Sequence, residues 1–256
     1  MMRADNPRVT DTYRALTARN GGVWCATMRS VQGRGRPRST SPTREGRNTR
    51  AEILDAAAEL ITLQGFGGTT TRQIAEAVGV RQNVLYHHFG SKEQILGSLL
   101  EALVCPALEA AEALAGVQAY TADDAAARLY ALAFHDANVL ATWRWNLGVL
   151  FALPEANSAA FHPAHQMRAQ LRGHYREFTE SVATHTGVAA AADHPFRLVE
   201  SIAAIRADGQ LSADTPHELA LGCLRLAGRV DRLAAVVGQA RALWESLGAP
   251  SAPELR

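Results

Sequence analysis

Residues 70–95 read TTRQIAEAVGVRQNVLYHHFGSKEQI, which is the most informative stretch of this chain. Ile74, Ala75 and Val78 share one face of a short helix, and Gly79 follows at the point where the chain must reverse. Glycine adopts a positive φ without strain, so it can end one helix and let a second one begin almost at once. The spacing therefore predicts a helix-turn-helix motif.

Capping patterns set the boundaries of these helices. Thr70 and Gln73 fit a capping box that opens the first helix, and Ser91 and Gln94 fit another that opens the third. Gly90 separates the second helix from the third. The caps and the glycine turn thus predict the same three helices independently.

The second helix of the motif has an inward and an outward face. Val80 and Leu85 supply apolar inward anchors, and His88 shares this arc, so we expect His88 to be half-buried. The outward side chains are hydrogen-bonding groups whose sizes suit base edges and phosphates: Arg81, Gln82, Asn83, Tyr86 and His87. This face indicates a surface that binds DNA.

Residues 49–95 resemble the DNA-binding domain of the TetR family of bacterial transcriptional regulators. Arg50–Ile61 (RAEILDAAAELI) matches the first helix of that domain, and LYHHF at 85–89 and GSKEQIL at 90–96 match its later part. The resemblance implies an all-α protein. A three-helix, homeodomain-like helix-turn-helix domain would be followed by a helical ligand-binding and dimerisation domain.

The resemblance also implies phosphate contacts. In family members the Tyr of the LY-x-HF block and the Lys that opens the next helix contact phosphates, and these roles transfer to Tyr86 and Lys92. We expect His87 to be a third phosphate partner.

Base reading in the family comes from the start of the second helix and from one residue of the first, which points to Gln82, Asn83 and Arg72. Glutamine can bond adenine through two hydrogen bonds, and arginine prefers guanine. Many relatives carry a Ser or Thr cap at the position of Arg81. Because arginine has no hydroxyl for capping, we expect Arg81 to reach DNA instead.

Residues 1–48 are rich in Arg, Gly, Pro, Ser and Thr and have no sustained periodicity, so we expect a disordered basic arm. Within it, Gly33–Arg38 reads GRGRPR. This run resembles an AT-hook, which would place Arg34 and Arg36 in an A·T minor groove. A loose cationic tail that adds only salt-sensitive attraction is an equal alternative.

The charge distribution supports a nucleic-acid partner for the first part of the chain. The whole sequence has a formal net charge of +1, yet residues 1–95 hold 14 Lys and Arg against 8 Asp and Glu. The remaining residues hold 12 against 17. The basic part is therefore the part expected to bind double-stranded DNA.

Beyond the motif the sequence forms alanine- and leucine-rich segments without the alternation typical of strands. We expect a DNA-binding domain over 49–95, a helical regulatory and dimerisation domain over 96–248, and a tail over 249–256. The expected helices of the regulatory domain are 91–115, 122–142, 143–152, 158–186, 195–206 and 215–247.

The segment 215–247 is expected to serve both a core and an interface. Its apolar residues from Leu219 to Trp244 recur in a 4-3-4-3 rhythm that indicates one core stripe. A flanking stripe is the predicted homodimer interface: Ala220, Leu224, Ala227, Ala234 and Gly238. The resemblance implies that 195–206 and 215–247 form a four-helix interface, so twofold symmetry would make the operator an approximate palindrome.

Aromatic and polar residues concentrate between Phe134 and Phe161, where we expect a small-molecule effector of unknown identity. An ordinary aromatic core is the alternative. The candidate ligand-binding residues are Phe134, His135, Asn138, Trp143, Trp145, Asn146 and Phe151.

The sequence supports metal binding less strongly than it supports a small-molecule effector. His162 and His165 could join His135 or Asp136 at a metal, but Pro163 interrupts the pair, so we expect neither a metal nor a cofactor. A metal-responsive regulator remains an alternative.

Other functional classes find little support in the sequence. We expect no enzyme, because no nucleophile–base pair, metal set or cofactor loop stands out. The absence of an 18-residue apolar run or a signal-peptide core predicts a cytoplasmic protein without a membrane partner. The expectation is a homodimeric repressor released from its operator by an effector, and a non-specific architectural DNA-binding protein is a second alternative.

Overall fold

The computed structural model describes residues 49–188 and 191–247. The predictions for the arm over 1–48, including Arg34 and Arg36, and for the tail over 249–256 lie outside these residues. Within the described ranges the chain forms helices and no strands, so the all-α prediction is confirmed. The first part consists of α3 (Thr49–Gly68), α4 (Thr71–Val78), α5 (Gln82–His88) and α6 (Lys92–Ala115).

The second part begins with α7 (Ala122–Thr142), which is followed by three short 3₁₀ turns. These turns are η1 (Leu147–Ala152), η2 (Pro154–Asn157) and η3 (Ala159–Phe161). The remaining helices are α8 (His162–Thr186), α9 (His194–Glu200), α10 (Ile202–Ala207), α11 (Thr215–Leu226) and α12 (Leu233–Ser246).

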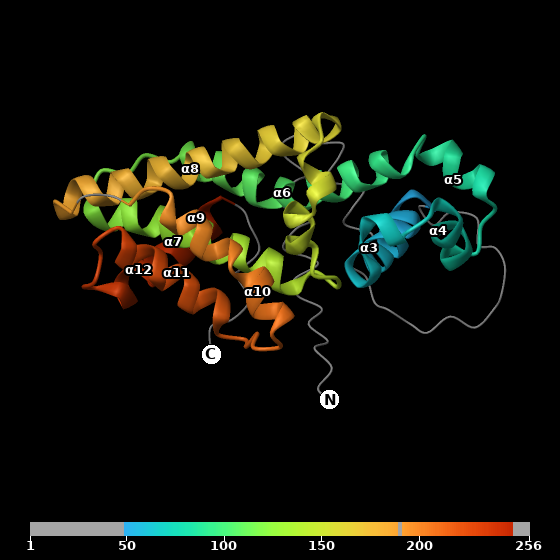
Figure 1. The fold of residues 1–256 in the computed structure, drawn as a ribbon. Helices are drawn as coiled ribbons and strands as arrows, with labels where there is room; N and C mark the ends of the chain where they lie inside the picture. Colours follow the sequence, from blue (N-terminus) through green and yellow to red (C-terminus); the bar gives the residue numbers. More distant parts are fainter. Residues whose placement is uncertain (1–48, 189–190, 248–256) are drawn as a thin grey trace.

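The molecule is elongated, with α3, α4 and α5 gathered at one end (Figure 1). At the other end α7 packs against α6, α8, α11 and α12. Helix α6 runs from the first group into the second, and η1 packs on both α3 and α6. The predicted boundary at 95/96 therefore falls within one continuous helix.

Capping in the helix-turn-helix follows the sequence pattern. The Thr70 hydroxyl accepts a hydrogen bond from the Gln73 amide at 3.2 Å, and the Gln73 side chain accepts one from the Thr70 amide at 2.8 Å. Gly79 ends α4 in the left-handed conformation with φ 79°. Ser91 accepts from the Gln94 amide, but the Gln94 side chain bonds to the Gly90 amide instead of the Ser91 amide, so the second box is only half formed.

Two hydrophobic clusters form the core. One lies in the regulatory helices and includes Tyr175, Phe178 and Trp244. The other joins Ile53 and Leu85 of the DNA-binding end to the following residues of the regulatory part: Val139, Trp143, Leu147, Leu150, Ala156, Phe161 and Ala164. The DNA-binding end and the 3₁₀ turns therefore share one core.

Helix α6 meets the length and composition of a membrane-spanning helix, although most of it is buried within the protein. Its buried side chains run from Ile95 to Leu114 and belong to both clusters. This burial is typical of the central helix of a folded domain.

The prediction of one helix over 215–247 is wrong. α11 ends at Leu226 and α12 begins at Leu233, because the backbone turns at Gly228, which adopts φ 81°. A side chain at this position would also clash with Val188. Buried Arg229 is ion-paired with Asp123 and fixes the turn. The apolar rhythm continues through this turn, which is why it resembled one helix.

Three other helix predictions need correction. Segment 143–152 is a bend followed by the 3₁₀ turn η1, and 195–206 is divided at Ser201 between α9 and α10. The helix predicted over 158–186 begins only at His162, after η3. By contrast, α7 over 122–142 agrees with the sequence pattern.

Candidate DNA-reading surface and effector pocket

Helix α5 presents the outward face expected from the sequence. Arg81, Gln82, Asn83, Tyr86 and His87 are all exposed, and α5 lies at the far end of the molecule (Figure 1). Arg81 stands at the N-cap with extended backbone and makes no capping bond with its side chain. The guanidinium is therefore available to a partner outside the domain.

Thr71 connects the two helices of the motif and was not predicted as a site residue. Its hydroxyl accepts a hydrogen bond from the Gln82 side-chain amide at 3.0 Å and lies 3.2 Å from the Tyr86 hydroxyl. Only the crossing of α4 and α5 brings these groups together, so sequence spacing gave no signal. Thr71 orients Gln82 and Tyr86 on the exposed face.

Arg72 projects from the first turn of α4 and bonds to Glu76 at 2.8 Å. The two side chains are 79% and 62% exposed. An ion pair so open to water contributes little to stability, so Arg72 can exchange Glu76 for another partner at small cost.

Lys92 has a role inside the domain that the sequence did not suggest. Its ammonium donates to the carbonyl oxygens of Phe66 and Thr69, both at 2.7 Å, and lies 4.1 Å from the Phe66 ring centroid. These bonds fix the end of α3 against the start of α6. One of the three N–H donors remains for the phosphate contact, which stays a prediction.

His88 is half-buried, as its position on the inward arc indicated. Burial lowers the pKa of its imidazole, and neighbouring His87 lowers it further. His88 is therefore held towards the neutral form.

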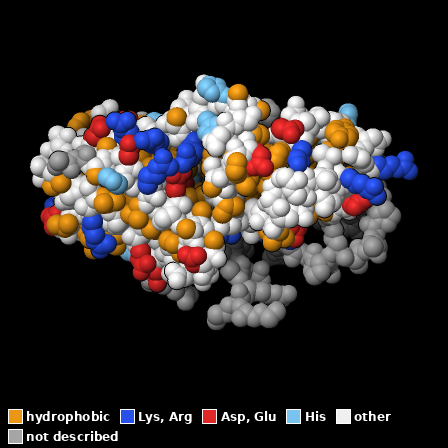
Figure 2. Space-filling model, viewed as in Figure 1, with side chains coloured by type: hydrophobic (Ala, Val, Ile, Leu, Met, Phe, Trp, Pro, Cys, Tyr) orange, Lys and Arg blue, Asp and Glu red, His pale blue; other side chains and the backbone are white. Residues whose placement is uncertain are grey.

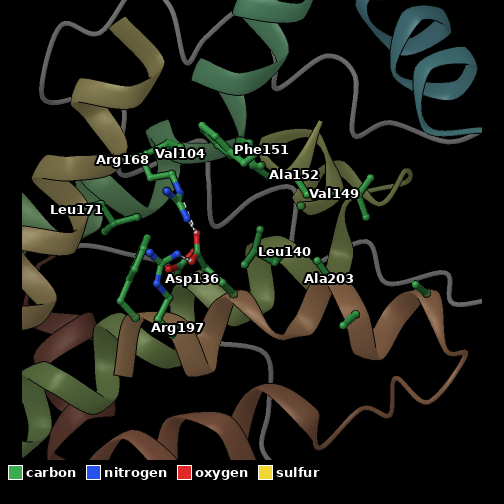
Figure 3. A pocket seen from close by; sticks show the side chains of 16 residues that line it. Val104, Asp136, Leu140, Val149, Phe151, Ala152, Arg168, Leu171, Arg197 and Ala203 are labelled. Carbon is green, nitrogen blue, oxygen red and sulfur yellow. Dashed lines mark hydrogen bonds and ion pairs between the residues drawn. The ribbon is translucent and has the colours of Figure 1, made fainter. Parts of the chain in front are cut away.

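A cavity of about 490 Å³ lies among α6, α7, η1, α8, α9 and α10 (Figure 3). Its volume falls within the range of small-molecule sites. The apolar part of its wall consists of Leu103, Val104, Leu140, Val149, Phe151, Ala152, Leu171, Phe196, Ala203, Ala204 and Ala207.

Arginines and acids meet at one side of this cavity. Arg168 donates to the Glu200 carboxylate through Nε at 2.8 Å, and Arg197 donates to the other oxygen of that carboxylate at 2.8 Å. In Figure 3 Arg168, Arg197 and Asp136 all point towards this side. Asp136 is fully buried and accepts a hydrogen bond from the Tyr175 hydroxyl at 3.0 Å. Burial raises the pKa of Asp136 to about 7.

Of the predicted ligand residues, Phe151 lines the cavity. Asn146 lies beside it and donates to the carbonyl of the wall residue Ala203 at 2.7 Å. The other five do not line this cavity: Phe134, His135, Asn138, Trp143 and Trp145.

These five residues serve packing and contacts within the fold. Phe134 stacks on Tyr130, and the ring of His135 packs against Trp244. Burial lowers the pKa of His135 to about 4. Asn138 bonds to the Phe134 carbonyl of its own helix, and Trp143 is buried in the shared core.

The fifth residue, Trp145, connects the regulatory part to α3. Its indole Nε1 donates to Asp55 at 3.0 Å, and Arg144 donates to the other carboxylate oxygen at 2.8 Å. The Arg144 guanidinium also lies over the Trp145 ring, 4.5 Å from its centroid. We call this three-residue contact the Asp55 clamp. Arg144 and Trp145 lie just before η1, which forms part of the cavity wall.

The predicted dimer residues divide into two groups. Ala220, Leu224 and Ala227 are fully buried within their own subunit, because α11 packs against α7 and α9, so these three cannot form a dimer surface. Ala234 and Gly238 are exposed on α12. They remain the part of the predicted interface that a second subunit could contact.

His162 and His165, the two histidines considered as metal ligands, lie at the start of α8. His165 bonds to the Ala156 carbonyl at 2.7 Å and packs on Phe151. Across residues 49–188 and 191–247, no group of three or more His, Cys, Asp or Glu side chains could hold a metal ion.

Comparisons with known proteins agree with this arrangement. Residues 53–99 match the family model described as "Bacterial regulatory proteins, tetR family". The crystal structure of Mycobacterium smegmatis AmtR is similar with a TM-score of 0.74 and 42% identity, over 83% of this chain and 100% of that one.

Two curated repressors are similar over the DNA-binding part. The transcriptional repressor KstR2 of Rhodococcus jostii is 42% identical over 64 residues, 25% of this chain and 30% of its own length. The class A tetracycline repressor of Escherichia coli is 42% identical over 52 residues, 20% of this chain and 24% of its own. These two alignments thus span less than a third of either relative.

Proposed function

Because the chain belongs to the tetR family of bacterial regulatory proteins, we propose that it is a transcriptional repressor that leaves its operator when a small molecule binds. The observation that carries this proposal is the exposed face of α5. Five hydrogen-bonding side chains stand there on a short helix, which caps and a glycine turn hold across α4. Such a helix fits the major groove.

The residues of this face would divide the work of recognition. Gln82 and Asn83 stand at the start of α5 and would read base edges, with Arg72 and Arg81 beside them. Tyr86, His87 and the remaining donor of Lys92 would bind phosphates. Thr71 would hold Gln82 and Tyr86 in place before DNA arrives, which reduces the entropy lost on binding.

The cavity would be the effector site. Its wall includes η1, and the Asp55 clamp joins the residues just before η1 to α3. A ligand that moves η1 would therefore change the position of the DNA-binding end. Because this linkage is reciprocal, operator binding would weaken effector binding by the same factor.

We place the homodimer contact on the exposed side of α12, around Ala234 and Gly238. The two α5 helices of a dimer, related by a twofold axis, would bind an approximately palindromic operator. The repressor would act in the cytoplasm, where bacterial operators lie.

The test begins by selecting the operator from a pool of random duplexes. Gln82→Ala should then cost about 1 to 3 kcal/mol of binding free energy on that operator and much less on random DNA. Gln170→Ala removes the same group from an exposed position on α8 and should change neither affinity. Equal losses for Gln82→Ala on both DNAs, with no preferred sequence, would favour an architectural DNA-binding protein instead.

A further inference from the structure

The polar side of the cavity carries more positive than negative charge. Arg168 and Arg197 share the carboxylate of Glu200. Just outside, Arg172 and Arg176 of α8 share Asp193, at 2.6 and 3.8 Å. Lys and Arg side chains gather over α8 and α9 in Figure 2, with acidic side chains between them; because these two helices contain no lysine, they are all arginines. Glu200 and Asp193 thus each form ion pairs with two arginines.

Asp136 does not balance this excess. It lines the same cavity as Glu200 and is buried, with the Tyr175 hydroxyl as its hydrogen-bond donor. Burial, and to a smaller extent the neighbouring Glu200, raises its pKa to about 7. A carboxyl group with this pKa is about half protonated at neutral pH, so it neutralises only part of the cationic excess.

Arg168 is already oriented for a carboxylate. Its guanidinium lies over the rings of Phe151 and Phe196, 5.0 and 5.3 Å from their centroids, and the side chain is 24% exposed. Contact with these two rings restricts its motion and removes part of its water. A restricted planar guanidinium binds carboxylates through paired hydrogen bonds and loses little entropy in doing so.

The rest of the cavity is apolar. Leu140, Val149, Ala152 and Ala203 lie away from the arginines in Figure 3, on α7, η1 and α10. A ligand that fills the cavity must therefore combine one anionic end with an apolar body.

We propose that the effector is a small organic carboxylate with an apolar body, and that its carboxylate replaces Glu200 on Arg168 and Arg197. This inference rests on the proposed function only in calling the ligand an effector. Glu200 is the last residue of α9, next to the break at Ser201. Its release would free α9 and α10 to shift, and Ala203 of α10 is bonded to Asn146 beside η1.

The test uses two acids and their neutral amides, titrated into the full chain without DNA by calorimetry. Octanoate is compared with octanamide, and naphthylacetate with naphthylacetamide, so that shape is kept and charge is removed. At least one acid should bind, roughly 10-fold or more tightly than its amide, because hydrogen bonds to a charged group are the stronger ones.

Three variants then locate the charge. Arg168→Gln should abolish the preference for the acid. Glu200→Gln should tighten acid binding several-fold, because the competing carboxylate is gone and both arginines are unpaired. Arg225→Gln changes an exposed arginine on α11 and should have no effect. Unfolding temperatures of all variants confirm that each is folded.

The possible results are distinct. Failure of both acids to bind, equal affinity for acid and amide, or weaker acid binding by Glu200→Gln would each overturn the carboxylate proposal. Operator binding is measured separately on the unliganded protein. If the acids bind as expected but no DNA sequence is preferred, the carboxylate site stands and the repressor function fails.

Discussion

Replacing Asp55 by alanine should loosen the DNA-binding end from the regulatory helices. The Asp55 carboxylate accepts one bond from Trp145 and one from Arg144, and both partners lie between α7 and η1. Alanine removes both acceptors, whereas asparagine keeps an acceptor for the indole and removes only the charge.

The size of the effect follows from the exposure of each partner. Arg144 is 46% exposed and Asp55 26%, so water screens their ion pair and its loss should cost only about 0.5 kcal/mol. The bond from the partly buried Trp145 indole to a charged acceptor should contribute about 1.5 kcal/mol. The expected loss of about 2 kcal/mol corresponds to a fall of about 4 to 8 °C in unfolding temperature for a chain of this size.

Thermal unfolding and amide hydrogen exchange measure this directly. Asp55→Ala should lower the unfolding temperature and speed exchange in α3 and η1, and Asp55→Asn should do so only slightly. Glu59→Ala removes a carboxylate one turn further along α3 and serves as the control. If Asp55→Ala unfolds at the same temperature as Glu59→Ala with the same exchange in η1, the clamp holds nothing and cannot transmit the effector signal.

Three further predictions concern other parts of the molecule. Lys92→Met should lower the unfolding temperature, because the Phe66 carbonyl loses its donor. It should also weaken binding to operator and random DNA alike. If DNA binding weakens while the unfolding temperature stays the same, Lys92 acts only as a phosphate contact. Ala227→Asp should unfold the subunit, since an unpaired buried carboxylate costs several kcal/mol. Ala234 is exposed, so Ala234→Asp should leave a folded monomer. If the Ala234→Asp variant still sediments as a dimer, the interface lies elsewhere. The pKa of Asp136 is about 7 in the folded state, against an ordinary 3.8, so only the unfolded chain readily releases this proton as pH rises from about 4 to 7. The protein should therefore lose stability over this pH range, and Asp136→Asn should flatten the dependence of unfolding free energy on pH. The same pH dependence in both proteins would contradict this.

Local patterns predicted the DNA-binding end well. The Thr70 cap, the Gly79 turn and the exposed face of α5 depend on residues at most a few positions apart, so spacing alone was enough. The internal role of Lys92 was not visible, because its partners are the backbone carbonyls of a preceding helix.

Long-range contacts limited the rest. The cavity brings together six segments from α6 to α10, and its arginines lie on α8 and α9, outside the aromatic region that the sequence emphasised. Aromatic residues such as Phe134 and Trp143 were chosen for their chemistry, but they pack in the core. The predicted helix over 215–247 failed because apolar spacing continues through the turn at Gly228, where the backbone does not.

The shared core also limits how far this protein can be treated as interchangeable parts. A hybrid regulator made by joining residues 49–95 to the effector domain of a relative would cut α6 just before Leu96 and Leu99. It would also leave Ile53 and Leu85 facing side chains that evolved against a different surface. Exchange of operator specificity is therefore better achieved by replacing only the exposed residues of α5, which contribute nothing to that core.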